Sequence, residues 1–143
     1  MNYVQTKGKI QLLTNEYLDD LFEGMKIEGE DYFYYFYVYQ IPKEGVLLLN
    51  GIIPVGDIEH SIVCFTNKRL LFLEITMMGK YTGNMKSVNL TEFKHIKVNR
   101  GMIRTSIVLT SKNGKGNTVI KANSFTFGLS NQKKNLIALE KLY

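Results

Sequence analysis

The stretch that decides the fold is Ser61-Ile-Val-Cys-Phe-Thr-Asn-Lys-Arg-Leu-Leu-Phe-Leu-Glu-Ile75. Two apolar runs meet in it across the polar tetrapeptide 66–69, a pattern that predicts a tight β-hairpin. Asn67 suits the turn because asparagine tolerates positive φ and can hydrogen-bond its own backbone. The flanking runs supply branched and aromatic side chains that fit a half-buried sheet, namely Val63, Phe65, Leu71 and Phe72. We therefore expect an architectural unit, not a catalytic one.

The chain after this hairpin continues in short segments with strand signals and ends in a helical one. Apolar or alternating runs cover residues 46–53, 87–90, 93–98, 106–110 and 118–122. The Gly-rich segment 113–117 predicts a second hairpin. Leu136, Leu139 and Tyr143 share a stripe that follows a possible Ser130 cap, which predicts a terminal helix. Residues 41–143 are thus expected to form one mainly β domain with a C-terminal helix.

Residues 1–40 are expected to form a separate N-terminal extension that begins with a helix. Its apolar residues recur at helical spacing, at Leu18, Leu21, Phe22 and Met25. Either Thr14 or Asn15 can cap the first turn of this helix.

The aromatic run Tyr32–Tyr39 holds seven aromatic residues in eight positions and has no polar face. Strand propensity and helical spacing both fit it, and we predict a short helix capped by Asp31. Packing is favoured over ligand stacking or a membrane-interface role, but a small domain is not expected to bury the whole run. The candidate association surface is therefore made of Tyr32, Phe33, Tyr35, Phe36 and Tyr39.

The central hairpin resembles the Thr-Asn-Lys-Arg-Leu-hydrophobic-Phe hairpin of bacterial pleckstrin-homology-like (PH-like) domains, the YokE-like group. The resemblance runs from Ile41 to Tyr143, through residues 41–46, 65–72 and 87–93. It implies a bent antiparallel β-barrel of seven strands whose open end is covered by the last helix. It also implies a binding module without a shared enzymatic activity, several of whose relatives assemble with themselves.

One departure from the wider PH pattern concerns ligand binding. Eukaryotic PH relatives hold phosphoinositides with basic residues on the first two strands and the loop between them. Here residues 46–61 contain Asp57 and Glu59 but no lysine or arginine, so the resemblance does not imply an inositol-phosphate pocket. For Lys68 and Arg69 it implies a turn-stabilising role at a solvated face.

The net charge of +5 is unevenly distributed along the chain. Residues 1–66 carry ten acidic and four basic side chains, whereas residues 67–143 carry three acidic and fourteen basic ones. Either the basic rear meets an anionic partner, or the acidic front folds across it. The densest basic set gives the candidate anion- or membrane-binding residues Lys94, Lys97, Arg100 and Arg104, with solvated loop charge as the alternative. No nucleic-acid-binding motif accompanies them, so no specific nucleic acid is expected.

The sequence offers little chemistry for catalysis. Cys64 stands alone within an apolar run, which predicts a buried thiol and a reducing cytoplasm. Two histidines and one cysteine without ligand spacing predict no metal, and no phosphate-binding loop or paired acid and base predicts a cofactor or an enzyme. The longest apolar stretch is far shorter than the roughly 20 residues that span a bilayer, and the first residues do not resemble a signal peptide.

The resulting functional expectation is a non-catalytic interaction or scaffold domain in the cytoplasm. Its expected partner is another protein or a second copy of itself in a homo-oligomer. The alternative is a peripheral binder of anionic membrane lipid that uses the basic face, and the third reading is an unrecognised enzyme.

Overall fold

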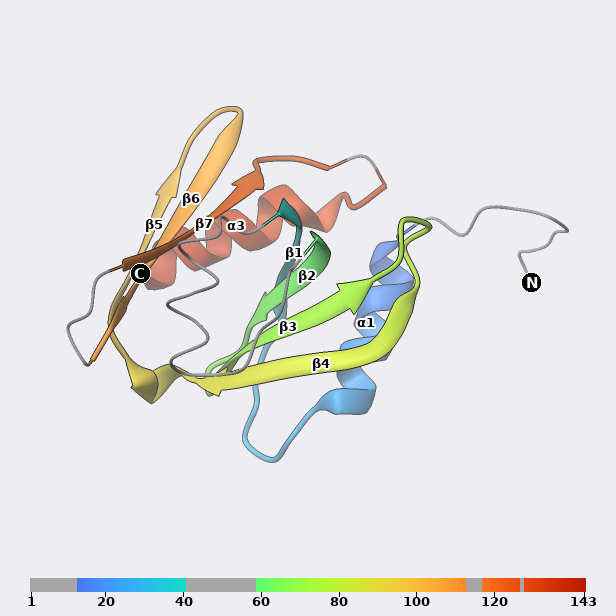
Figure 1. Ribbon diagram of the computed structural model, residues 1–143, viewed down its shortest axis with the longest axis horizontal. Coiled ribbons are helices and arrows are strands. Elements are labelled where there is room, and N and C mark those ends of the chain that lie inside the picture. Colours follow the sequence, from blue (N-terminus) through green and yellow to red (C-terminus); the bar gives the residue numbers. More distant parts are fainter. Residues whose placement is uncertain (1–12, 41–58, 113–116, 127) are drawn as a thin grey trace, which may run out of the picture.

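The described residues of the protein fold into two antiparallel sheets and two flanking helices (Figure 1). The computed structural model describes residues 13–40, 59–112, 117–126 and 128–143. The first sheet contains β1 (Tyr34–Gln40), β2 (Glu59–Phe65), β3 (Arg69–Ile75) and β4 (Tyr81–Asn89), and the second contains β5 (Phe93–Arg100), β6 (Arg104–Ser111) and β7 (Asn117–Asn123). Helix α1 (Asn15–Met25) precedes β1, the 3-10 helix η1 (Leu90–Glu92) links the sheets, and α3 (Asn131–Leu142) follows β7. The mainly β fold with a C-terminal helix is confirmed.

Strands β1 to β3 of the first sheet are buried on both faces, which explains their continuous apolar runs, whereas β4 at the edge of the sheet is mostly exposed. On one face, Tyr35, Ile62 and Leu71 pack with Leu18 and Phe22 of α1. On the other face, strand residues join α3 and the second sheet in the main core, among them Phe36, Val63, Phe72, Ile107 and Leu136. A strand covered on both sides needs no polar face, so its side chains do not alternate in polarity.

The aromatic run is a strand, and the predicted short helix is wrong. Tyr34–Gln40 forms β1 and pairs antiparallel with β2, with Phe36 opposite Val63. Successive side chains of a strand point to opposite faces. Tyr35 therefore enters the α1 side and Phe36 enters the main core, so the sheet already includes residues that the sequence assigned to an extension.

The β2–β3 hairpin forms as predicted, but its turn is held differently. The Thr66 hydroxyl accepts hydrogen bonds from the backbone N–H groups of Lys68 and Arg69, at 3.0 and 2.9 Å. Asn67 does not have positive φ. Its side chain donates instead to the Gly29 carbonyl at 2.9 Å and accepts from the Asp31 N–H at 2.9 Å. The turn is thus fastened to residues 29–31, a distant partner that the local sequence pattern does not reveal.

Arg69 is structural, as expected, but it does not lie at a solvated face. Its guanidinium group donates to both carboxylate oxygens of Glu30, at 2.8 and 3.1 Å. It also donates to the Met25 carbonyl at the end of α1, at 2.7 Å. The side chain of Glu30 has no exposed surface, so this is a buried ion pair that joins α1 to the hairpin.

The two sheets do not close into a barrel among the described residues, and α3 seals the gap between them. Among the described strands, β1 and β7 lie at the edges of their sheets. Between them, the fully buried Gln132 accepts from the Tyr37 N–H at 2.8 Å and donates to the Asn123 carbonyl at 2.7 Å. Asn135 donates to the Tyr35 carbonyl at 2.9 Å. Amide side chains of α3 therefore satisfy strand-edge groups that a closed barrel would pair strand to strand.

The predictions of α1 and α3 agree with the structure apart from one cap. The Thr14 hydroxyl accepts from the Tyr17 N–H at 3.1 Å, which caps α1. Ser130 precedes α3 but its side chain caps nothing, because its hydroxyl accepts from the Asn15 side chain at 2.7 Å. The predicted strand 46–53 and the turn of the second hairpin at 113–116 lie outside the described residues.

Candidate functional site

The turn between β5 and β6 presents two apolar side chains to solvent. Met102 is 95% exposed and Ile103 is 78% exposed. The turn is tight, since the Gly101 N–H donates to the Arg104 carbonyl at 2.9 Å. A Cβ atom at position 101 would collide with that same carbonyl oxygen, so the turn requires glycine. We call the turn Gly101–Ile103 the tip.

The tip is fixed in place by the residue that follows β7. The Ser124 N–H donates to the Ile103 carbonyl at 2.8 Å, and the Ser124 hydroxyl donates to the Gly101 carbonyl at 2.6 Å. The same hydroxyl contacts the buried Thr105 hydroxyl at 3.1 Å. Because these bonds hold both sides of the turn, Met102 and Ile103 are presented on a rigid support.

Basic side chains continue from the tip across the outer face of the second sheet. Arg104 begins β6, Lys121 lies opposite Ser106, and Lys97 lies opposite Val108. These three positions alternate with the buried residues of the strands, so they share the solvent face, and all three side chains are exposed. We call Arg104, Lys121 and Lys97 the outer basic face.

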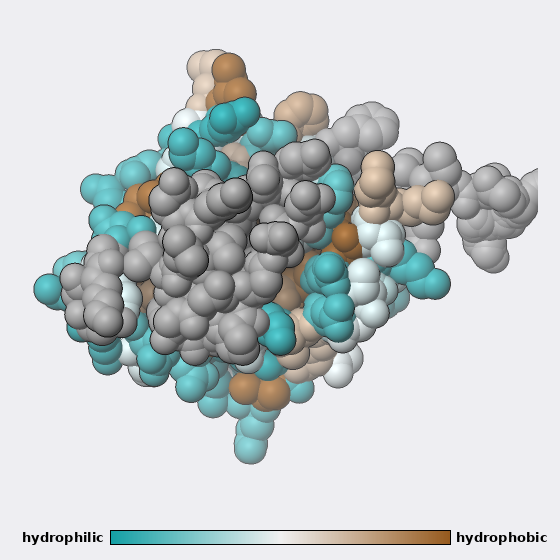
Figure 2. Space-filling model, viewed as in Figure 1, coloured by the Kyte–Doolittle hydropathy of each residue, from teal (hydrophilic) through white to brown (hydrophobic). Residues whose placement is uncertain are grey.

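The described strands of the second sheet contain no acidic residue that would offset this charge. With a rise of about 3.4 Å per residue, Lys121 lies about 7 Å and Lys97 about 14 Å from the level of Arg104. In Figure 2 hydrophobic atoms project at the top of the molecule, where Figure 1 places the tip, and hydrophilic atoms lie beneath them. The tip and the outer basic face thus form one apolar and cationic end of the molecule.

The structure does not bring the four predicted basic residues together. Lys97 and Arg104 share the outer face. Arg100 points to the other side, where its Nε donates to Glu140 of α3 at 3.0 Å. Lys94 lies at an irregularity near the start of β5, at the end of the strand opposite to the tip. Only two of the four therefore act on one surface.

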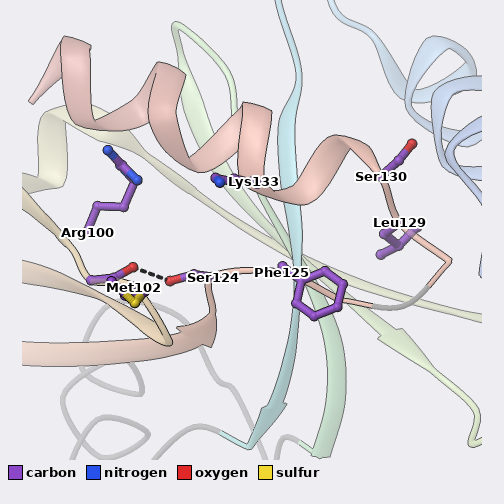
Figure 3. A pocket seen from close by; sticks show the side chains of 8 residues that line it. Arg100, Met102, Ser124, Phe125, Leu129, Ser130 and Lys133 are labelled. Carbon is purple, nitrogen blue, oxygen red and sulfur yellow. Dashed lines mark hydrogen bonds between the residues drawn. The ribbon is translucent and has the colours of Figure 1, made fainter.

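A pocket of about 630 Å³ opens between the tip and the start of α3 (Figure 3). In Figure 3, Arg100 and Lys133 lie on the α3 side, and Met102 and Phe125 lie on the opposite side. The described residues that line it are Arg100, Gly101, Met102, Ser124, Phe125, Leu129, Ser130 and Lys133. It therefore combines two cations and two hydroxyl groups with an apolar wall.

Two residues of the predicted aromatic surface are buried in the core. Tyr35 is 2% exposed and Phe36 is fully buried. The Tyr35 hydroxyl donates to Asp19 at 2.7 Å. Burial, and to a smaller extent this hydrogen bond, raises the pKa of Tyr35 well above its usual value. Tyr32 and Phe33 are half-buried, and Tyr39 lies in β1. The expectation of an exposed surface is therefore wrong for Tyr35 and Phe36.

The thiol of Cys64 lies among the core residues between the first sheet and α1. Cys64 is fully buried, and burial raises the pKa of its thiol well above the usual value, so the reactive thiolate is disfavoured. Within residues 13–40, 59–112, 117–126 and 128–143, no group of three histidine, cysteine or acidic side chains could hold a metal ion. None of the helices in these ranges is both long and apolar enough to cross a bilayer.

Sequence reasoning missed the residues that define this end of the molecule, namely Met102, Ile103, Phe125 and Lys133. One signal was available: hairpin turns are usually polar, whereas Arg100-Gly-Met-Ile-Arg104 places two apolar residues between two arginines. Phe125 and Lys133 carry no such signal, because only the fold brings them to the tip.

The comparisons with known proteins agree with this architecture. A family model described as bacterial PH domain matches residues 28–134, and this range includes both sheets and the first part of α3. The match begins ahead of the boundary expected after residue 40. No curated protein and no solved structure matches the sequence. Since the family model covers well over half of the chain, this protein belongs to the bacterial PH domain family.

Proposed function

We propose that this protein is a non-catalytic interaction domain of the cytoplasm that docks peripherally on anionic membrane surfaces. The observation that carries the proposal is the exposed apolar tip beside the outer basic face. An anionic membrane has a negatively charged headgroup layer over an apolar acyl layer. The tip can enter the apolar layer while the outer basic face contacts the anionic headgroups.

The expected energies are sufficient for reversible docking. Removing one large apolar side chain from water contributes about 1.5–3 kcal/mol, and Met102 and Ile103 are almost fully available for this. Each lysine or arginine near an anionic surface adds about 1 kcal/mol. Because the Debye length is about 8 Å at physiological ionic strength, Arg104 and Lys121 are expected to contribute more than the remoter Lys97.

Self-association through the aromatic run has less support than membrane docking. Two of its five candidate residues, Tyr35 and Phe36, are core residues, and Tyr32 and Phe33 are half-buried, which leaves little exposed aromatic surface on these four residues for a partner. Membership of the YokE-like group rests on the 65–72 hairpin and is part of the same proposal.

Sedimentation with lipid vesicles tests membrane docking. The full chain should pellet with anionic vesicles and not with neutral ones, and pelleting should weaken as salt concentration rises. Arg104→Glu and the double change Met102→Ser with Ile103→Ser should each weaken the apparent affinity by about tenfold or more. Lys94→Glu is the matched control, since it makes the same charge change at the far end of β5 and should have a much smaller effect.

Two results would reject membrane docking. One is a wild-type chain that stays in the supernatant with anionic vesicles even at low salt. The other is an equal loss of pelleting in the Lys94 and Arg104 variants, which would indicate that net charge alone governs binding.

A further inference from the structure

The pocket beside α3 has features of a small-molecule site, and it shares only Met102 and Gly101 with the tip on which membrane docking rests. Its volume of about 630 Å³ lies within the roughly 300–1,000 Å³ of ligand pockets in proteins. Its cations, Arg100 and Lys133, differ from those of the outer basic face. The pocket and the outer basic face can therefore be tested separately.

The charged side of the pocket is suited to an anion. Glu140 accepts from Nε of Arg100, which fixes the direction of the guanidinium group and leaves its two terminal amino groups as further donors. Lys133 is exposed and has no acidic partner among the described residues. It lies in the first turn of α3, which contains no acidic residue, although that end of a helix favours negative charge. An anion bound in the pocket would supply the negative charge that this end of the helix favours and would pair with Lys133.

The opposite side of the pocket is suited to an apolar group. Phe125 is 70% exposed and Met102 is 95% exposed, and both line the pocket together with the buried Leu129. Apolar surface that lines a groove beside polar residues is typical of ligand-binding sites. The charged and apolar sides lie across the same opening, so one ligand can contact both.

We propose that this pocket binds a small anionic amphiphile, a phosphate monoester or carboxylate head joined to an apolar tail. The head contacts Arg100 and Lys133, and the tail lies against Phe125 and Met102. Such a molecule can come from a membrane or exist free in solution, and both sources share the chemistry that the pocket recognises. The proposal goes beyond membrane docking, because the pocket can be filled with or without a bilayer.

Calorimetric titration of the full chain with octyl phosphate, kept below its micelle concentration, tests the pocket. Octyl phosphate should bind saturably, and about tenfold or more tighter than inorganic phosphate, which lacks the tail, or octanol, which lacks the charge. Lys133→Gln should weaken binding of octyl phosphate by about tenfold. Lys134→Gln is the matched control, since it removes the neighbouring exposed cation of α3, which does not line the pocket.

A second variant separates the two halves of the ligand. Phe125→Ser should weaken octyl phosphate but leave inorganic phosphate unchanged, and the exposed position of Phe125 keeps the fold intact. If octyl phosphate does not bind, or binds equally well to the Lys133 and Lys134 variants, the pocket proposal is wrong.

Vesicle sedimentation distinguishes the source of the amphiphile and separates this proposal from membrane docking. If octyl phosphate binds and Lys133→Gln also weakens pelleting with phosphatidate vesicles, the head comes from the membrane. If octyl phosphate binds but Lys133→Gln leaves pelleting unchanged, the natural ligand of the pocket is an amphiphile free in solution. Pelleting that persists in a chain unable to bind octyl phosphate rejects the pocket and leaves membrane docking standing. Binding of octyl phosphate without any pelleting supports the pocket and rejects membrane docking.

Discussion

Arg69 joins the C-terminal end of α1, the buried Glu30 and the central hairpin through one guanidinium group. The sequence predicted a structural role for this residue but placed it in solvent, because two adjacent charges in a turn are usually solvated. Its partner lies 39 residues away, and no local pattern shows which acidic side chain will be buried beside it. The same limit applies to Asn67, whose partners are residues 29 and 31.

Replacing Arg69 should therefore be far more costly than replacing its neighbour. Arg69→Ala leaves the Glu30 carboxylate buried without its partner, which should lower the free energy of unfolding by about 3–5 kcal/mol. Lys68→Ala should stay within about 0.5 kcal/mol, because the Lys68 side chain is exposed. Chemical denaturation of the two variants measures both values, and equal losses would contradict the buried ion pair.

Glu30 should also make stability depend on pH in the acid range. Burial alone would raise the pKa of Glu30, but hydrogen bonds from Arg69, Thr66 and the Ile27 N–H outweigh it and hold the pKa below its usual value of 4.5. A carboxyl group with a lowered folded-state pKa stabilises the fold above its unfolded-state pKa, and this contribution is lost as pH falls through the folded-state pKa.

The comparison of wild type with Glu30→Gln measures this contribution. The difference in their free energies of unfolding should be constant above about pH 5 and should shrink below the unfolded-state pKa of about 4.5, since protonated glutamate resembles glutamine. A difference that does not change between neutral and acid pH would show that the ionised carboxylate contributes nothing to stability.

At the scale of elements, the hairpins, α1 and α3 could be predicted because their apolar spacing and turn residues are local signals. β1 could not be assigned by spacing, because the first sheet is covered by α1 on one face and by the main core on the other. Strand propensity alone pointed to the correct structure. The gap between β1 and β7, which α3 seals, could not be predicted either. Nothing in the sequence around Gln132 or Asn135 indicates that these amide side chains will hydrogen-bond to strand edges.

Gln132 should be one of the most sensitive polar positions of the molecule. Gln132→Ala removes hydrogen bonds to the Tyr37 N–H and the Asn123 carbonyl, and should lower the free energy of unfolding by about 2–4 kcal/mol. The neighbouring exposed Lys134→Ala provides the control and should change it by less than about 0.5 kcal/mol. Equal losses of unfolding free energy for the two variants in urea would mean that Gln132 does not seal the gap between β1 and β7.

At the scale of the whole molecule, the acidic helix α1 and the outer basic face lie on different sheets. The acidic helix α1 packs against the first sheet, on the right in Figure 1, whereas the second sheet lies on the left. The described acidic residues of α1 therefore do not cover the outer basic face. The sequence predicted the asymmetry but left open whether the front covers the rear, since that depends on which face of which sheet α1 contacts.

The most direct test of membrane docking reports which end of the molecule meets the bilayer. An environment-sensitive fluorophore is attached at Met102→Cys in one variant and at Met77→Cys in another. Met77 is also highly exposed, 87%, but follows β3 in the turn before β4, and the buried Cys64 is not expected to react with the label. On addition of anionic vesicles, the emission from position 102 should shift to the blue as the tip leaves water, while that from position 77 stays constant. A shift at position 77 without one at position 102, or no shift at either while the protein pellets, would contradict docking through the tip.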